Sequence, residues 1–545
     1  MATMGFLQNE TFTKKREKDT LIVDNTFRHS YAVGQTGCGK TSSFIYPNLD
    51  DRLSKGHGVL IFDYKGKEHT SVKYLAEQHN RLEDIIELGI PWGKSCNLIQ
   101  YFNEKELGNF VAGIMNLNEK DLYWTTTGSN LVISVWKIIN SYIDVIKATE
   151  DFNIRENLYS AVIRFRLPTQ VTFSGITTVL SSHENIVKFI TNAKKVYERF
   201  NATIEANVHE MAMRLDSESI EESYLEIVSK NIIFKNVLNE QMKALQIFID
   251  SKNASNQTTT IQSILLSMST TFTSIANNKS INDYNGVEIA ESLSQGKIVI
   301  LNAQEFSDVV LATLTSSILQ ELSKRVQQKE IRSVSIFIDE AQRVLNKDFG
   351  SLHSDVLRES KVELFLAFQN HQLMINKLGA EQFYALVQNL SSAYIFANSL
   401  DFQDFETSKL DTFEYYYKQN DRKYMAEPLF IDQNAVFEVL LKYCKINKLH
   451  DYLGIAKEHH NKVIQFNPYL YQQNSIELKS KEGDIIVVKL RDIDMENSAK
   501  EMIEKMISSY AVKLRKRNVN LKPSLMSYIE KKERELNEFL DVANE

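Results

Sequence analysis

Apolar residues follow two patterns along the chain. Short apolar runs, each bounded by polar or glycine residues, are typical of buried strands. These runs are "HSYAV" (29–33), "GVLIFD" (58–63), "DIIELG" (84–89), "GKIVILNA" (296–303), "SVSIFIDEA" (333–341), "VELFLAF" (362–368) and "SAYIFAN" (392–398). Helical periodicity dominates residues 104–284 and returns at 311–328. Strands that alternate with helices predict a mainly parallel sheet, and the long helical stretch predicts an insertion into it.

We therefore predict the α/β fold class, with an inserted all-alpha domain and a C-terminal α+β appendage. The appendage is expected to hold a hairpin at 462–490 followed by a charged helix. The expected boundaries are 1–103 and 285–425 for the two parts of a nucleotide-binding domain, 104–284 for the insertion and 426–545 for the appendage.

Composition narrows the class of protein but not its partners. The 545 residues are enough for several cores, and 43% hydrophobic with 24% charged residues is ordinary for a soluble protein. Three cysteines without metal-ligand spacing fit a reducing cytoplasm better than a disulfide framework. No apolar run is long enough to span a membrane and no signal peptide is recognised, so we predict a cytoplasmic protein. A net charge of −7 argues against a protein that binds nucleic acid over most of its surface, but it allows a local basic channel.

The strongest motif is "GQTGCGKT", which follows the first predicted strand and opens a helix. Backbone N–H groups of such a loop surround phosphates, its lysine reaches the β and γ phosphates, and its threonine ligates Mg²⁺. The motif predicts an ATP and Mg²⁺ site. Its nucleotide-binding residues would be Gly34, Gln35, Thr36, Gly37, Cys38, Gly39, Lys40 and Thr41.

"SIFIDEAQRVL" (335–345) is the expected partner of this loop, because its apolar strand ends in two acids. Asp339 is predicted to ligate Mg²⁺, and Glu340 to polarise the attacking water. Taken alone, the pair could be a strand that ends in solvated acids. The two motifs stand some 300 residues apart, a separation that the inserted helices explain.

Two further polar residues are candidates for catalysis. Gln369 ends a predicted buried strand, where it would either sense the γ-phosphate or only cap the strand. Arg358 precedes that strand and would be either an arginine finger supplied to a neighbouring subunit or a solvated arginine. The aromatic and basic stretch "TFEYYYKQNDRKY" (412–424) suits stacking on single-stranded DNA, but packing of its tyrosines in a sheet is favoured.

With these residues assembled, the chain resembles the TraG/TraD-like type IV coupling proteins of the FtsK–HerA superfamily. The resemblance covers about residues 25–400, and it rests on "GQTGCGKTSSFIYPNL", "VLIFDYKGKE" and "DLYWTTTGSNLV". The spacings of Asp339, Arg358 and Gln369 also match the family. No membrane anchor of the kind found in the family is expected here. The chain also departs from the family in Tyr64, which replaces a proline, and in "DEAQ" at the strand end.

The resemblance implies a RecA-like P-loop ATPase that assembles as a homohexamer and moves DNA. The DNA would be single-stranded or bound to a relaxase, and would pass to a membrane channel of a type IV secretion or conjugation system. Arg358 would then act in the neighbouring subunit, and the helical domain would recognise the substrate. The protein would reach the inner face of the cell membrane through its partners.

Two alternatives remain open from the sequence. A HerA-like ATPase in DNA processing or defence against foreign DNA would share the motor and would need no membrane-spanning helix, as expected here. An adaptor that uses ATP to recruit protein substrates is the other alternative. The complete set of Glu340, Arg358 and Gln369 speaks against it, because a scaffold needs no hydrolytic residues.

Overall fold

The computed structural model describes most of the chain up to Asn447 and three short strands beyond it. The described residues are 18–24, 27, 29–66, 68–90, 93–116, 122–149, 151–212, 218–250, 255–327, 331–345, 354–397, 410–420, 422–447, 463–465, 475–479 and 485–489.

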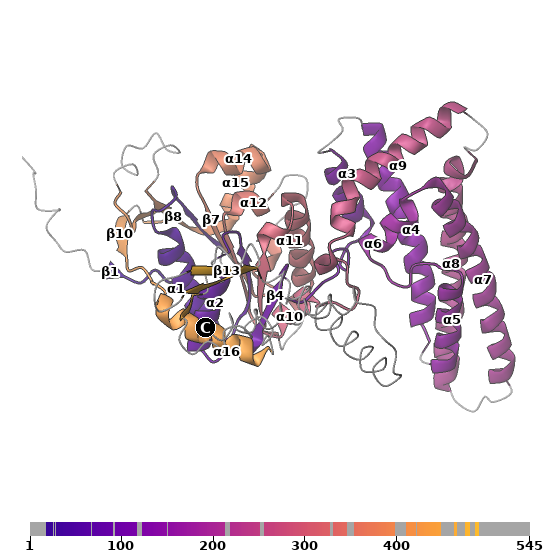
Figure 1. Ribbon diagram of the computed structural model, residues 1–545, viewed down its shortest axis with the longest axis horizontal. Coiled ribbons are helices and arrows are strands. Elements are labelled where there is room, and N and C mark those ends of the chain that lie inside the picture. Colours follow the sequence, from indigo (N-terminus) through magenta and orange to yellow (C-terminus); the bar gives the residue numbers. More distant parts are fainter. Residues whose placement is uncertain are drawn as a thin grey trace, which may run out of the picture.

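A twisted sheet of ten strands, in the order β1-β10-β9-β8-β2-β7-β6-β3-β5-β4, forms the centre of the larger unit (Figure 1). All pairs are parallel except those that β9 makes with β8 and β10. This sheet confirms the predicted α/β class. The strands are β1 (Lys18–Asp19), β2 (His29–Val33), β3 (Gly58–Asp63), β4 (Ile85–Leu88), β5 (Ile298–Asn302), β6 (Val334–Asp339), β7 (Val362–Phe368), β8 (Leu390–Phe396), β9 (Glu414–Tyr417) and β10 (Arg422–Ala426).

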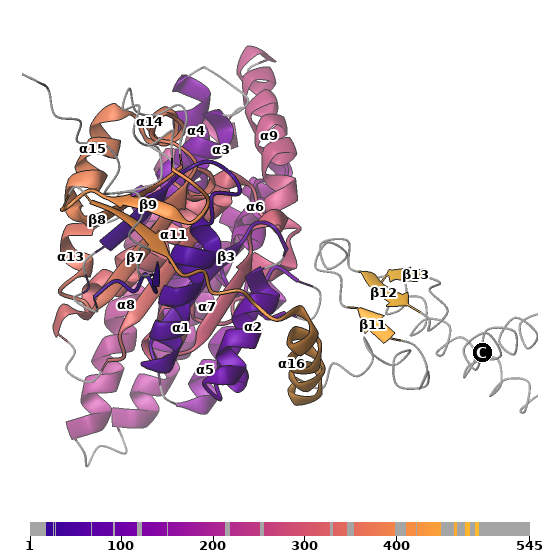
Figure 2. The same cartoon turned by 90° about the vertical axis from the view of Figure 1, so that its left-hand side faces the viewer.

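The central strands are buried on both faces, which explains why they are almost wholly apolar. Successive side chains of a strand point to opposite faces of the sheet, so they belong to two different hydrophobic cores. Val59 and Ile61 of β3 belong to the core under α1 (Tyr46–Ser54) and α2 (Glu68–Gln78), two helices that Figure 2 shows in front of the sheet. Leu60 and Phe62 belong to the core on the other face, under α11 (Asp308–Ser323).

Short helices complete the cover of the sheet and connect its strands. They include a π-helical turn, η1, directly after the glycine loop. These segments are η1 (Thr41–Ile45), η2 (Leu82–Asp84), η4 (Lys279–Ile281), α10 (Ile289–Ser294), η5 (Ala303–Glu305), η6 (Lys324–Gln327), α12 (Ala341–Val344), α13 (Ser354–Leu357), α14 (His371–Leu378) and α15 (Ala380–Asn389).

Seven helices between β4 and β5 form a group beside the sheet (Figure 1). Their apolar faces continue the core that lies under α11, so the group is packed against the α/β unit. The helices are α3 (Glu104–Asn116), α4 (Leu122–Lys147), α5 (Phe152–Arg164), α6 (Phe173–Leu180), α7 (His183–Ala212), α8 (Glu218–Asp250) and α9 (Ser255–Ala276). Aromatic side chains pack between the long helices. The ring centres of Tyr142 on α4 and Phe234 on α8, for example, lie 5.9 Å apart.

Residues after β8 continue the sheet. The tyrosines of β9 and β10 stack within it, with Tyr394 on Tyr417 at 5.0 Å and Tyr415 on Tyr424 at 5.6 Å. The stretch 412–424 therefore follows the favoured interpretation of tyrosines packed in a sheet. Helix α16 (Gln433–Ile446) then packs on α2, and Lys73 lies over the Tyr443 ring at 4.4 Å.

Three antiparallel strands, β11 (Val463–Gln465), β12 (Ser475–Lys479) and β13 (Ile485–Lys489), stand where a hairpin was predicted. The predicted charged C-terminal helix lies outside the described residues, and the bounds of the four predicted segments remain predictions. Within the described part of the chain, no helix is long and apolar enough to cross a membrane.

Candidate functional site

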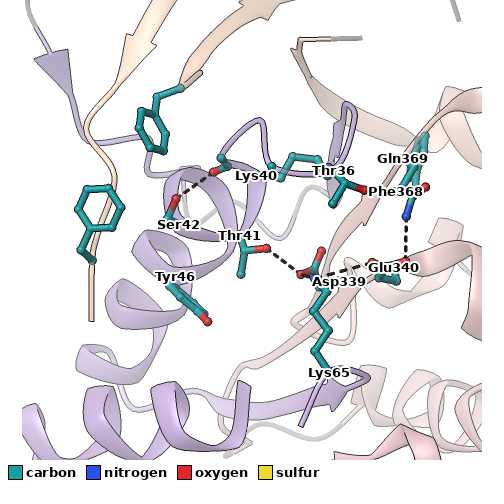
Figure 3. A pocket seen from close by; sticks show the side chains of 14 residues that line it. Thr36, Lys40, Thr41, Ser42, Tyr46, Lys65, Asp339, Glu340, Phe368 and Gln369 are labelled. Atoms are coloured by element: carbon teal, nitrogen blue, oxygen red, sulfur yellow. Dashed lines mark hydrogen bonds and ion pairs between the residues drawn. The ribbon is translucent and has the colours of Figure 1, made fainter. Parts of the chain in front are cut away.

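The pocket of interest (Figure 3) opens at the carboxyl edge of the parallel sheet. Strands β2, β7 and β6 lie next to one another there. Ligands of open α/β sheets bind at this edge, because the loops that follow parallel strands meet there. The pocket is lined by Thr36, Gly37, Gly39, Lys40, Thr41, Ser42, Tyr46, Lys65, Asp339, Glu340, Phe368, Gln369, Phe413 and Phe430.

The glycine loop curls around the Lys40 side chain. Lys40 Nζ donates to the carbonyl oxygens of Gly34 at 2.6 Å and of Gln35 at 3.0 Å, so its ammonium is held inside the loop by groups that a phosphate could replace. Gly39 has a φ of 98°, a backbone conformation in which a residue with a side chain would be strained. Cys38 is buried in this loop, and burial raises the pKa of its thiol despite the opposing charge of Lys40.

Thr41 and Asp339 meet across the pocket although 298 positions separate them. Thr41 Oγ1 donates to Asp339 Oδ2 at 2.8 Å. A hydroxyl and a carboxylate are the hard oxygen ligands that Mg²⁺ accepts, with phosphate and water completing its shell. No cluster of three or more His, Cys, Asp or Glu side chains suited to a metal is found among the described residues. The donor set thus fits Mg²⁺ held together with a nucleotide.

Glu340 stands beside Asp339 with its backbone in the left-handed region, at a φ of 75°. This conformation costs a non-glycine residue about 1–3 kcal/mol and is concentrated at functional sites. Its carboxylate accepts from Gln342 Nε2 at 2.8 Å and from Gln369 Nε2 at 3.3 Å. The structure therefore joins Glu340 and Gln369, which were predicted separately from two strand ends.

Lys65 is a residue of the site that sequence reasoning missed. Its Nζ lies 3.1 Å from Asp339 Oδ2 and 3.7 Å from Glu340 Oε1 (Figure 3). Burial lowers the pKa of this lysine, but the surrounding carboxylates outweigh burial and raise it, so Lys65 is a cation at the predicted metal ligand. A signal was present, since "DYKGKE" is a polar turn directly after a buried strand.

Arg358 is not brought into the pocket of this subunit. It is exposed in the turn before β7, whereas Gln369 follows the other end of that strand. Seven residues of strand span roughly 20 Å, so the Arg358 backbone lies at the opposite edge of the sheet. Its action on a neighbouring subunit remains a prediction.

Aromatic side chains on the segment after β8 were also missed as part of the site. Phe413, which has a φ of 70°, donates its backbone N–H to the Cys38 carbonyl at 3.1 Å. Phe430 lines the pocket with it. The aromatic-rich stretch 412–424 holds Phe413 but gives no sign that its ring faces the glycine loop, and nothing in the sequence marked Phe430.

No protein-family model and no curated protein sequence matches the chain. Solved structures of similar fold do exist. The unbound conjugative coupling protein TrwB is 12% identical, with a TM-score of 0.42 over 77% of this chain and 90% of that one. TrwB in complex with ADP and Mg²⁺ gives 12% identity and a TM-score of 0.41 over the same shares. VirB4 of Thermoanaerobacter pseudethanolicus is 10% identical, with a TM-score of 0.38 over 76% of this chain and 94% of that one. The chain is thus similar in structure to a conjugative coupling protein and to VirB4.

Proposed function

We propose that the chain is an ATP-hydrolysing motor that moves DNA towards a secretion or conjugation channel. The observation that carries the ATPase part is the network at the strand ends. There Asp339 bonds to Thr41 of the glycine loop, and the adjacent Glu340 bonds to Gln369. A lone glycine loop would bind phosphate, but these added carboxylate and amide groups are suited to hydrolysis.

Each side chain then has a defined task. Lys40 and the loop N–H groups bind the phosphates, while Thr41 and Asp339 would hold Mg²⁺, which neutralises phosphate charge when bound. Gln369 and Glu340 orient a water for attack on the γ-phosphorus. As the new P–O bond forms, the bond to the ADP oxygen breaks and Glu340 accepts the proton of the water.

The DNA part of the proposal is supported by the order and spacing of the motifs, which resemble those of coupling proteins. In this proposal the subunits form a homohexameric ring, Arg358 reaches the nucleotide of a neighbour, and helices α3–α9 contact the substrate. The exposed position of Arg358 is compatible with a role between subunits.

Steady-state ATP hydrolysis by the purified chain tests the proposal, measured alone and with single- or double-stranded DNA. We expect hydrolysis that DNA stimulates and that rises cooperatively with protein concentration. Lys40→Ala should abolish it, because the phosphates lose their cation. Lys55→Ala is the matched control, because Lys55 makes only an exposed pair with Asp51 at 2.6 Å.

Each outcome separates one part of the proposal from another. Absence of hydrolysis in the wild type, or hydrolysis retained in Lys40→Ala, would refute the proposed ATPase activity of this site. Hydrolysis that ignores both kinds of DNA would refute the DNA motor and favour a protein substrate. Loss of stimulation in Arg358→Ala, with nucleotide binding retained, would support action between subunits.

A further inference from the structure

We propose that Phe430, supported by Phe413, is the surface on which the purine base of the bound nucleotide stacks. The inference rests on the proposed function, since it takes the pocket at the glycine loop to be the nucleotide site. It adds the part of the ligand that the phosphate-binding residues leave undescribed.

Phe430 is an exposed aromatic ring between two partly buried apolar residues. Leu429 and Ile431 on either side of it pack against the core shared with α1 and α2. Phe430 itself is 69% exposed and lines the pocket. The exposed part of this ring therefore faces the pocket, where a bound ligand would cover it.

Two backbone hydrogen bonds attach the segment to the glycine loop and its helix. The Leu429 N–H donates to the Ser42 carbonyl at 2.8 Å, and the Phe413 N–H donates to the Cys38 carbonyl at 3.1 Å. The Phe413 ring lies so close to Gly39 that an added Cβ would stand 2.4 Å from it. Both rings are therefore fixed relative to the loop that would hold the phosphates.

The rings also support each other. The ring centres of Phe413 and Phe430 lie 5.8 Å apart with planes at 81°, an edge-to-face pair. Phe413 is thus held between Gly39 and the second ring, which leaves the exposed surface of Phe430 for a flat partner.

The expected direction of the triphosphate along the glycine loop places the base at the end of the pocket where Phe430 lies. Glu340 and Gln369 mark the end where the γ-phosphate must lie, since they position the attacking water. Figure 3 shows Ser42 on the other side of Thr41 from these two side chains. The segment of Phe430 is bonded to Ser42, so a nucleotide with its γ-phosphate at Glu340 extends its base towards Phe430.

A purine is the chemical class that fits, because it offers the largest flat π-face among the bases and an aromatic ring binds that face by stacking. Stacking tolerates different bases, so Phe430 should increase the affinity for both ATP and GTP. Inorganic tripolyphosphate, which has the same phosphates and no base, should gain nothing.

Calorimetric titration of the full chain with ATP, ADP and tripolyphosphate, each with Mg²⁺, tests the inference. We expect Phe430→Ala to raise the Kd of ATP and ADP about tenfold, equivalent to ~1.4 kcal/mol, and to leave the Kd of tripolyphosphate unchanged. Phe430→Trp should retain nucleotide affinity. Phe152→Ala is the matched control, because Phe152 is 72% exposed on α5 of the helical insertion.

Two results would overturn the stacking site while leaving the proposed function intact. One is an unchanged ATP affinity in Phe430→Ala, and the other is an equal loss of ATP and tripolyphosphate affinity, which would mean that Phe430 only shapes the loop. Failure of the proposed function looks different: the wild type would bind neither ligand, or Lys40→Ala would bind both as well as the wild type. In that case the stacking site fails with it.

Discussion

Strands β6 and β7 carry charged clusters at both of their ends, and the two clusters are built differently. At the amino ends, Arg52 and Glu363 form an ion pair of 2.6 Å with both side chains 0% exposed. At the carboxyl ends, Lys65 lies 3.1 Å from Asp339, and the lysine side chain is 43% exposed. We call the buried Arg52–Glu363 pair the closed pair and the partly exposed Lys65–Asp339 pair the open pair.

The closed pair is also hydrogen-bonded on all sides. Arg52 donates to the Val23 carbonyl at 2.8 Å, while Glu363 accepts from Ser335 at 2.7 Å and has His57 at 3.5 Å. Removal of one partner would leave a buried charge without compensation. The open pair can exchange its partners for water or a ligand at little cost, which a site that binds and releases nucleotide requires.

The largest effect is expected from Arg52→Met. It should lower the free energy of unfolding by about 3–5 kcal/mol, because Glu363 would remain buried without its cation. Urea denaturation measures the change as a lower midpoint. A loss of less than about 1 kcal/mol would show that the closed pair is not structural.

Glu340→Gln should separate activity from stability. The loss of the general base should lower kcat at least about 100-fold, or ~2.7 kcal/mol in the activation barrier. Nucleotide affinity and the urea midpoint should stay close to wild type, because the amide keeps the shape of the side chain. Unchanged kcat would remove Glu340 from the proposed chemistry.

A smaller effect should appear on acidification. Burial alone would raise the pKa of Glu363, but hydrogen bonds from its neighbours outweigh burial and hold that pKa below its ordinary value of 4.5. A lowered folded-state pKa gives stability that is present above pH 4.5 and is lost as the pH falls through the folded-state pKa.

Glu363→Gln should therefore flatten the fall of stability in this acid range, by at most about 1.4 kcal/mol per pH unit for one proton. Urea midpoints of both proteins between pH 3 and about 6 measure the difference. Equal slopes would contradict a depressed pKa for Glu363.

The smallest effect is expected from Lys65→Met, which makes the same exchange of a cation for methionine at the open end. A partly exposed ion pair contributes about 0–1 kcal/mol, so the urea midpoint should move little. A destabilisation as large as that of Arg52→Met would abolish the distinction between the two clusters.

Much of the candidate site could be predicted from the sequence because its motifs are local. The glycine loop needs a strand before it and a helix after it, and both are visible as apolar periodicity around residues 29–54. Asp339 and Gln369 are each recognisable as polar residues at the end of a buried run. Lys65 stands in a polar turn after a buried strand, but nothing local says which carboxylate it faces.

The sequence by itself determined strands β2 to β8, the glycine loop and the two acids at the end of β6, since each depends on a few adjacent residues. Tertiary structure decided which of these meet. The order of strands brings Thr41 to Asp339 and Arg52 to Glu363 across about 300 residues, and turns Phe430 towards the glycine loop. The physical reason is that hydrogen bonds and ion pairs are selected by distance in space, which only strand order and helix packing fix.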